Sequence, residues 1–281
     1  MANTNKAACR SLVQKAAGLI EGASHRAICE AATAQFAGLD GPSCPDAAAL
    51  TQQVDLLMVF GGDGTMLRIS RETAGSRTPI LGINVGSLGF LTDVPADQLQ
   101  LALKQIWAGE VILETRPLIE ASGKTQGQTV SLLALNDFVL TRGAAPRLIE
   151  LQASVDEEVL TNYRCDGLIV CSPTGSTAYS LAAGGPVVNP SAEVFTLTPI
   201  CPHALSNRSV IIGLHSTVKV KVLSETVEVI LTADGQTTYP LAAGDVITIR
   251  KSRATISLLH LAGSTFFDTL RRKLNWSGSN L

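Results

Sequence analysis

The sequence has no excess of basic residues and no long apolar run. Its 22 Lys and Arg stand against 24 Asp and Glu, a formal net charge of −2. This balance gives no electrostatic reason for nucleic acid or an anionic membrane to be the main partner. Gly, Pro or a charge breaks every apolar stretch well before the ~18 residues that a transmembrane helix needs. We therefore expect no nucleic-acid partner and no membrane partner.

Metal-binding and export patterns are also missing. None of the 6 cysteines forms a Cys-x-x-Cys pair, which argues against a zinc site. The first ten residues, MANTNKAACR, contain no apolar core of a secretory signal. We therefore expect a cytoplasmic protein with reduced thiols. A length of 281 residues, 46% of them hydrophobic, suffices for one large or two modest globular domains.

Apolar patterning at the front of the chain is typical of an α/β layer. Helical spacing alternates there with short apolar runs that indicate buried parallel strands. The expected helices span about 6–22, 65–71 and 98–107, and the expected strands span 54–60 and 79–83. Strands and helices in this alternation predict a parallel sheet with helices packed against it.

The pattern changes near residue 110. From there to about 260, short runs rich in Val, Ile, Leu and Thr replace helical spacing, apart from a short helix expected at 177–183. Helical spacing returns near the end of the chain. The predicted domains are an α/β domain over 1–108, completed by a C-terminal helix at 262–281, and a β-rich domain over 109–261.

A glycine-rich loop, Gly61-Gly62-Asp63-Gly64-Thr65, directly follows the first expected strand. Its glycines let a phosphate chain approach the backbone, and the next helix offers unpaired N–H groups to an anion. The charge of Asp63 would repel phosphate, which suggests work on a hydroxyl or on a metal-bound phosphate. The alternative is that Asp63 only caps the helix. The loop is not a P-loop, and a dinucleotide fingerprint would need Gly in place of Leu67.

Three further segments carry polar residues at notable places. The segment 166–180, DGLIVCSPTGSTAYS, places hydroxyls and a Gly at a strand-to-helix turn, where they bind a polar ligand or merely form the turn. Asn136-Asp137 interrupts an apolar run, a costly arrangement unless a ligand such as ribose, or water at a strand edge, satisfies it. Asp234-Gly235-Gln236 predicts a hairpin turn.

Together these residues resemble the bacterial NAD kinase family. The similarity keeps its register and order from about residue 50 to 276, and the segment around SPTGSTAYSLAAGGP is highly specific. GGDG alone also occurs in diacylglycerol and sphingosine kinases and in phosphofructokinases. The matching segments are GGDGTML (61–67), NVGSLGFLTD (84–93), LNDFVLTRG (135–143), RCDGLIVCSPTGSTAYSLAAGGPVVNP (164–190), LTPICPHALSNRS (197–209) and LRRKLNW (270–276).

The resemblance implies an NAD kinase-like fold, α/β with GGDG and then β-rich, with NAD in the cleft between the two domains. It implies transfer of a phosphoryl group from ATP or another donor to the 2′-hydroxyl of NAD's adenosine ribose, with Asp63 as the base. It also implies a divalent cation, Mg²⁺ carried with the triphosphate, and a homodimer or homotetramer. The binding residues that it implies are Gly62, Gly64, Thr65, Arg68, Asn136, Asp137, Arg147, Arg164, Asp166, Thr174, Thr177, Ala178, Tyr179, Ser180, Leu181, Ala182 and Gln236.

The sequence departs from the family in three places. Asp137 stands where relatives have Glu, and Ser209 follows Arg208 where many have Pro. Relatives begin with a short apolar strand, whereas ANTNKAACRSL after Met1 resembles the loop behind it. We therefore expect the first strand to be missing or the start to be assigned too late.

Two other functions share part of the pattern. A GGDG lipid kinase of the diacylglycerol type would need an apolar groove and a membrane-facing basic or amphipathic surface. The sequence offers neither, and SPTGSTAY argues against that function. A nucleotide sensor without activity is disfavoured by the intact Asp63 and its glycines.

Overall fold

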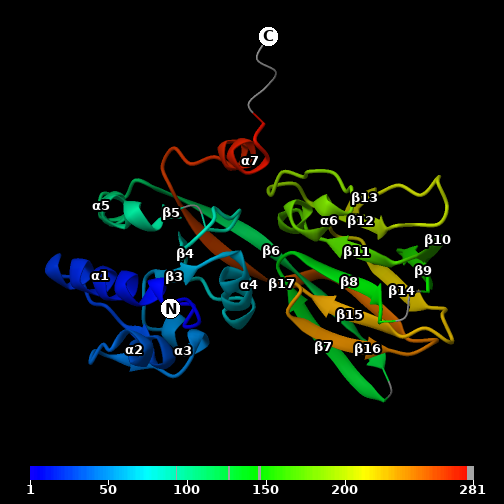
Figure 1. Ribbon diagram of the computed structural model, residues 1–281, viewed down its shortest axis with the longest axis horizontal. Coiled ribbons are helices and arrows are strands. Elements are labelled where there is room, and N and C mark those ends of the chain that lie inside the picture. The colour runs from blue at the N-terminus through cyan, green and yellow to red at the C-terminus, as the bar shows by residue number, and fades with distance from the viewer. Residues whose placement is uncertain (93, 126, 145–146, 277–281) are drawn as a thin grey trace, which may run out of the picture. The chain divides into compact units, whose positions relative to one another are not determined.

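The computed structural model describes residues 1–92, 94–125, 127–144 and 147–276 (Figure 1). The chain divides into two compact units, Met1–Thr115 with Thr255–Leu281, and Arg116–Ala254. The first unit is α/β with a parallel sheet and the second is β-rich and antiparallel, which confirms the predicted fold class. Among the described residues, no helix is long and apolar enough to cross a membrane.

The first unit alternates helices and short strands. Its elements are α1 (Ala8–Gly22), β1 (Cys29–Glu30), α2 (Ala31–Ala37), β2 (Ser43–Cys44), α3 (Ala47–Thr51), β3 (Leu57–Gly61), α4 (Asp63–Glu72), β4 (Ile80–Asn84), β5 (Val94–Pro95), the 3₁₀ turn η1 (Ala96–Gln98), α5 (Leu99–Trp107), the start of β6 (Val111–Thr125), the end of β17 (Val246–Leu261) and α7 (Phe266–Leu274). The predicted helices at the front and the predicted strands at 54–60 and 79–83 correspond to α1, α4, α5, β3 and β4.

Parallel pairing organises this unit. β3 pairs with β4, and β4 pairs with β5 and with the end of β17, all in parallel. Every residue of β4 is buried, as expected for a strand covered on both faces. Phe60 and Ile83 share one apolar cluster with Val13 of α1 and Leu103 of α5. Burial therefore explains the apolar runs of these two strands, which only Asn84 at the end of β4 interrupts.

Residues 1–3 run beside β3, although the segment after Met1 was expected to be a loop and the first strand to be missing. Ala2 forms a parallel bridge with Phe60. The Phe60 N–H donates to the Met1 carbonyl at 2.9 Å, and the Asn3 N–H donates to the Phe60 carbonyl at 2.9 Å. These bonds satisfy backbone groups of β3 that would otherwise be unpaired inside the unit.

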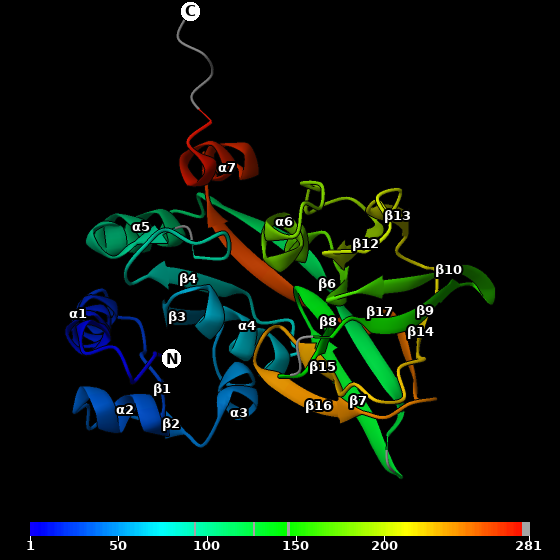
Figure 2. The same cartoon turned by 45° about the vertical axis from the view of Figure 1, so that its right-hand side comes forward.

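The second unit is built from antiparallel strands, best followed in Figure 2. Its elements are the rest of β6, β7 (Gln128–Ala134), β8 (Asp137–Arg142), β9 (Ile149–Val155), β10 (Glu158–Cys165), β11 (Gly167–Cys171), the 3₁₀ turn η2 (Thr174–Thr177), α6 (Tyr179–Ala182), β12 (Val194–Ile200), β13 (Val210–Gly213), β14 (Val218–Val222), β15 (Val229–Ala233), β16 (Thr237–Leu241) and the start of β17. One sheet has the order β13-β12-β11-β8-β15-β16, and β10-β9-β14-β17 forms another run. Phe138 and Phe195 of the first share a core cluster with Leu151 and Val220 of the second.

Several elements differ from expectation for identifiable reasons. The helices α2 and α3 have 7 and 5 residues, too few to produce a recognisable helical period. β10 lies at a sheet edge and is mostly exposed, so it lacks an apolar pattern. The helix expected at 177–183 is a 3₁₀ turn and one α-helical turn, separated by Ala178, whose ψ of −127° is not helical.

Candidate active site

Two loops of the first unit begin at the same edge of its parallel sheet. β3 ends at Gly61 and β4 ends at Asn84, and these two residues are in register. Open α/β sheets bind ligands outside the carboxyl ends of their strands. At Gly61 a Cβ atom would lie 2.5 Å from the Thr65 hydroxyl. The residue that leads into the loop therefore has to be glycine for α4 to begin where it does.

Asp63 is the first residue of α4, and its carboxylate bonds to the loop 86–92. Oδ2 accepts from the Phe90 N–H at 2.8 Å, and Oδ1 accepts from the Leu91 N–H at 3.1 Å and from the Thr92 hydroxyl at 3.2 Å. These partners do not belong to α4, so the alternative of a simple helix cap does not describe the side chain. A carboxylate has about four lone-pair positions, which leaves about one for a substrate hydroxyl.

Asn84 and Gly89 support this arrangement, which sequence reasoning missed. The Asn84 side-chain amide donates to the Thr92 hydroxyl at 2.9 Å and to the Ser87 carbonyl at 2.8 Å. Because the hydroxyl accepts from Asn84, its own proton is directed to Asp63. A Cβ atom on Gly89 would lie 1.9 Å from Asp63 Oδ1. Any side chain at position 89 would therefore displace the carboxylate.

The other predicted site residues of this unit lie on or beside the same loop. Gly62 is half-buried, Gly64 is exposed and Thr65 is buried. Arg68 forms an ion pair with Glu72 at 2.8 Å, one turn further along α4, and both side chains are about 40% exposed. Such an exposed i,i+4 pair contributes little to stability, so Arg68 remains accessible to a polar ligand.

Asn136 and Asp137, which interrupt an apolar run in the sequence, lie at a break between two strands. β7 ends before Leu135, and β8 begins at Asp137. The carboxylate of Asp234, in the turn between β15 and β16, accepts hydrogen bonds from the backbone N–H groups at the break. It accepts from Leu135 at 3.1 Å, from Asn136 at 2.8 Å and from Asp137 at 3.3 Å. The strand breaks because these N–H groups donate to a side chain and not to a neighbouring strand.

Asp234 is a third residue whose role the sequence did not reveal. The predicted hairpin is confirmed, since Ala233 pairs with Thr237 across the turn. Asp234 and Gly235 have φ values of 49° and 65°, in the left-handed region that Asp and Gly tolerate. Asp-Gly therefore serves both to turn the chain and to hold the Asn136-Asp137 segment.

The segment after β11 packs on the other side of Asn136. The Ser172 N–H donates to the Asn136 carbonyl at 2.8 Å, and the Ser172 hydroxyl donates to the Leu135 carbonyl at 2.5 Å. At Gly175 a Cβ atom would lie 2.1 Å from the Asn136 carbonyl oxygen. Ser172 and Gly175 of SPTGST thus pack against the backbone of Leu135 and Asn136 and hold it in place.

Asp137 is a buried carboxyl group, only 4% exposed. Within the described ranges, no hydrogen bond or ion pair reaches its carboxylate oxygens. Burial, followed by the nearby charge of Asp234, raises the pKa of Asp137 to about 7. A buried carboxyl without a partner is costly, and two hydroxyl donors from a ligand would offset that cost.

The segment from Thr174 to Ala182 combines anchored and accessible residues. Arg116 is buried and donates to the Thr174 hydroxyl at 3.1 Å, a contact that the sequence did not indicate. Ser180 is buried, and its hydroxyl lies 3.0 Å from that of Thr198. Five other members are half-buried or exposed and can contact a ligand: Thr177, Ala178, Tyr179, Leu181 and Ala182.

The other predicted binding residues of this unit are dispersed over its surface. Asp166 pairs with Arg142 at 2.8 Å, and the exposed Arg164 lies 3.9 Å from Glu150. Gln236 is exposed in the β15–β16 turn. Arg147 is exposed, and in the described part of the chain it forms no ion pair or side-chain hydrogen bond. These predicted residues therefore come from separate segments, around 147, 164–166 and 236.

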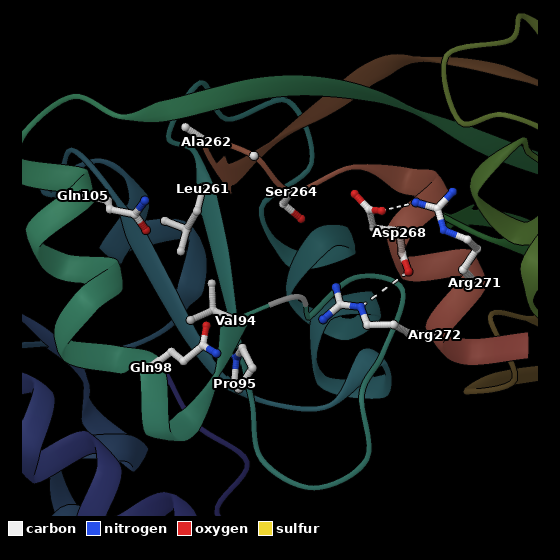
Figure 3. Close-up of a pocket in the computed structure, with 11 residues that line it drawn as sticks. Val94, Pro95, Gln98, Gln105, Leu261, Ala262, Ser264, Asp268, Arg271 and Arg272 are labelled. Atoms are coloured by element: carbon white, nitrogen blue, oxygen red, sulfur yellow. Dashed lines mark hydrogen bonds and ion pairs between the residues drawn. The ribbon is translucent and has the colours of Figure 1, made fainter. Parts of the chain in front are cut away.

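A cavity of about 490 Å³ in the first unit contains none of the predicted site residues. Figure 3 shows Asp268 of α7 between Arg271 and Arg272. Arg271 forms an ion pair with the Asp268 carboxylate, and Arg272 donates to the Asp268 carbonyl at 3.4 Å. Because none of the residues that the resemblance implies lines this cavity, it is a weak candidate for substrate binding.

No metal cage is present in the described ranges, where no three His, Cys, Asp or Glu side chains converge. The loop 61–64 offers glycines and one carboxylate. This donor set fits a cation such as Mg²⁺ that keeps its waters and is held by phosphates, with at most one carboxylate ligand from the chain.

Comparison of the sequence with known proteins identifies similar domains and relatives. Residues 46–111 match the model of the ATP-NAD kinase N-terminal domain, and residues 135–261 match that of the ATP-NAD kinase C-terminal domain. An NAD kinase of Syntrophotalea carbinolica is 40% identical over 260 residues, covering 92% of this chain and 91% of the relative. An NAD kinase of Desulforamulus reducens is 44% identical over 82% of both chains.

Solved structures give the same result. Yeast NADH kinase complexed with NADH superposes with a TM-score of 0.85 at 26% identity, covering 96% of this chain and 84% of that one. An Archaeoglobus fulgidus NAD kinase in complex with ATP gives a TM-score of 0.70 at 30% identity, covering 87% and 92%. Two domain models in order, relatives of at least 40% identity and these folds show that the chain belongs to the ATP-NAD kinase family of phosphotransferases.

Proposed function

We propose that this chain is an NAD kinase that transfers the γ-phosphoryl group of ATP, or of another donor, to the 2′-hydroxyl of NAD's adenosine ribose. The observation that carries the proposal is Asp63, held by three donors beside a glycine loop with about one acceptor position open. Family membership and the two similar structures, one complexed with NADH and one with ATP, support it.

In this mechanism Asp63 acts as the general base. The 2′-hydroxyl donates its proton to a free lone pair of the Asp63 carboxylate as its oxygen attacks the γ-phosphorus. The bond from the γ-phosphorus to the bridging oxygen breaks, and the products are NADP and the nucleoside diphosphate. A positioned base contributes about 10²–10⁴-fold. Alignment and charge neutralisation supply most of the remainder.

The second unit supplies the binding groups for NAD. Asp137, buried and unpartnered in the described ranges, accepts ribose hydroxyls, and Asn136 beside it binds the adenosine part. The accessible residues of the segment 177–182, all of its members except Ser180, bind a neighbouring part of the dinucleotide. Arg147, Arg164, Asp166, Thr174 and Gln236 are proposed as further contacts, on the resemblance alone.

A divalent cation completes the proposed site. When bound with the triphosphate, it neutralises charge on the transferring group. Asp63 is the one carboxylate that the loop 61–64 offers as a ligand. We also propose a cytoplasmic homodimer or homotetramer, which light scattering tests, since a particle of one 29.5 kDa chain would contradict it.

The direct test is an assay of the purified chain with NAD, ATP and Mg²⁺. We expect NADP, measured with an NADP-specific dehydrogenase, and a ³¹P spectrum that places the new phosphate on the 2′-oxygen. Diacylglycerol vesicles replace NAD as the control for a lipid kinase. Phosphatidic acid without NADP would overturn the proposal, and so would binding of both nucleotides without phosphoryl transfer.

A further inference from the structure

Lys6 lies in the turn that joins residues 1–3 to α1, at the edge of the sheet where the loops of Asp63 begin. Its ammonium group donates to the carbonyl of Val85, the residue after β4, at 2.8 Å. A Cβ atom on Gly86 would lie 3.5 Å from Lys6 Nζ, and one on Gly62 would lie 3.9 Å from it. The ammonium therefore lies on the side of both glycines where a side chain would otherwise stand, next to the carboxyl ends of β3 and β4.

The topology explains why a residue so far from these loops in sequence is there. Residues 1–3 run parallel to β3, and β3 runs parallel to β4. All three segments therefore end at the same sheet edge, and the turns that follow them meet. Gly86 has a φ of 129°, a conformation that side chains rarely adopt. The loop surface next to Lys6 is therefore bare backbone.

The contact with Val85 uses only one of the hydrogen-bond donors of Lys6. An ammonium group has three donors, and the bond to Val85 accounts for one. In the described part of the chain Lys6 forms no ion pair with a carboxylate, and the residue is exposed. A cation beside glycines and the start of a helix is a common way to bind phosphate.

We propose that Lys6 binds the phosphates of the nucleoside triphosphate donor. The inference rests on the proposed function and adds a residue that neither the sequence motifs nor their resemblance indicated. Asp63 on the adjacent loop repels a polyphosphate, and the ammonium of Lys6 offsets that repulsion where the glycines admit the phosphates. The donor is favoured over NAD because the residues proposed to bind NAD belong mostly to the other unit.

The test compares three variants with the wild-type chain. Lys6→Met keeps the length of the side chain without its charge, Lys6→Arg keeps the charge, and Lys15→Met removes another exposed lysine, on α1, as the matched control. We expect Lys6→Met to raise the KM for ATP about tenfold or more, the usual effect of losing a charge-assisted hydrogen bond. The KM for NAD should stay within about twofold, Lys6→Arg should restore most of the loss, and Lys15→Met should behave as wild type.

A binding measurement makes the inference independent of turnover. Calorimetry with a non-hydrolysable ATP analogue and Mg²⁺, at a temperature well below the unfolding midpoint of each variant, should show the same weakening in Lys6→Met. An unchanged affinity for the analogue overturns the inference. A rise in the KM for NAD alone also overturns it, and points to the dinucleotide. A lower midpoint with unchanged ATP affinity assigns Lys6 to holding the Val85 loop. A wild-type chain that binds the analogue but makes no NADP contradicts the proposed function and not the role of Lys6.

Discussion

Asp234 accepts a 2.8 Å hydrogen bond from the backbone N–H of Asn136, 98 residues earlier in the chain. The same carboxylate accepts from the two residues on either side of Asn136. A hairpin turn thereby holds the residues proposed to bind the ribose. A side chain that touches no ligand can in this way control the affinity for one.

Replacing Asp234 by Ala should weaken NAD binding as well as the fold. Buried N–H groups left without acceptors cost about 1–3 kcal/mol, and Asn136 and Asp137 lose their support. We expect the KM for NAD to rise more than the KM for ATP. Asp156→Ala is the matched control, because Asp156 also has a positive φ in a hairpin turn and accepts from a backbone N–H, that of Thr217 at 2.8 Å. If both variants changed the KM for NAD equally, the proposal that Asp234 supports the NAD-binding segment would be wrong.

Removing the carboxyl group of Asp137 should raise the KM for NAD far more than it lowers kcat. The reason is that a charge-assisted hydrogen bond to a ribose hydroxyl contributes roughly 1.5–3 kcal/mol. Steady-state kinetics of Asp137→Ala, with NAD varied at saturating ATP, measures the effect. Asp137→Glu restores the residue of the relatives and should keep most of the affinity. An unchanged affinity for NAD in Asp137→Ala would exclude the ribose contact.

Stability should depend on pH through Asp137. Its pKa is raised from the ordinary value of 3.8 to about 7 in the folded chain, so the folded state binds the proton more tightly than the unfolded state does. The tighter proton binding by Asp137 therefore adds fully to the free energy of unfolding below about pH 4, and this contribution is lost as the pH rises to about 7. Asp137→Asn removes this titration. In urea unfolding, we expect the free energy of unfolding of the variant to rise relative to that of the wild type between about pH 4 and pH 8. A difference between the two free energies that does not change with pH would contradict the raised pKa.

Much of the fold was predictable because local patterns carry it. β3, and β4 up to its last residue Asn84, are apolar because they are buried, and α4 follows a glycine loop that marks its start. The contacts that shape the site were not predictable in this way. The residues around Asp234 in the sequence give no sign that it contacts Asn136, and those around Lys6 give no sign that it contacts Val85. Such contacts form only when distant strands align, and the local hydrophobic pattern does not show which residues then meet.

Gly89→Ala tests how closely the loop 86–92 fits Asp63. A Cβ atom at this position would lie 1.9 Å from Asp63 Oδ1, so the carboxylate has to move or the loop has to retreat. If Asp63 is the base, a displacement of this size should lower kcat about a hundredfold. Gly41→Ala is the control, since a Cβ atom there meets nothing within 4 Å. Full activity in Gly89→Ala would show that the position of the carboxylate does not limit the reaction.

Asp63→Asn is the decisive variant for the mechanism, and the structure changes what it is expected to do. In the wild type both carboxylate oxygens accept, Oδ2 from Phe90 and Oδ1 from Leu91 and Thr92. An Asn amide has one oxygen and one NH₂ group, so its NH₂ must face a donor. We therefore expect a loss of stability of about 1–3 kcal/mol together with the loss of rate. The variant is not structurally silent.

The effects on structure and chemistry can be separated with a second variant. Thr92→Val removes one donor to Asp63 and leaves the carboxylate in place, so it should lower the unfolding midpoint while keeping most of kcat. Asp63→Asn should lower kcat by two or more orders of magnitude, and kcat/KM with it, because the lost proton acceptor acts only in the transition state. Rescue by high Mg²⁺ would assign Asp63 to the metal. Retention of more than about a tenth of kcat would contradict a base that contributes ~10²–10⁴-fold, and the role of Asp63 would then be to hold the loop 86–92.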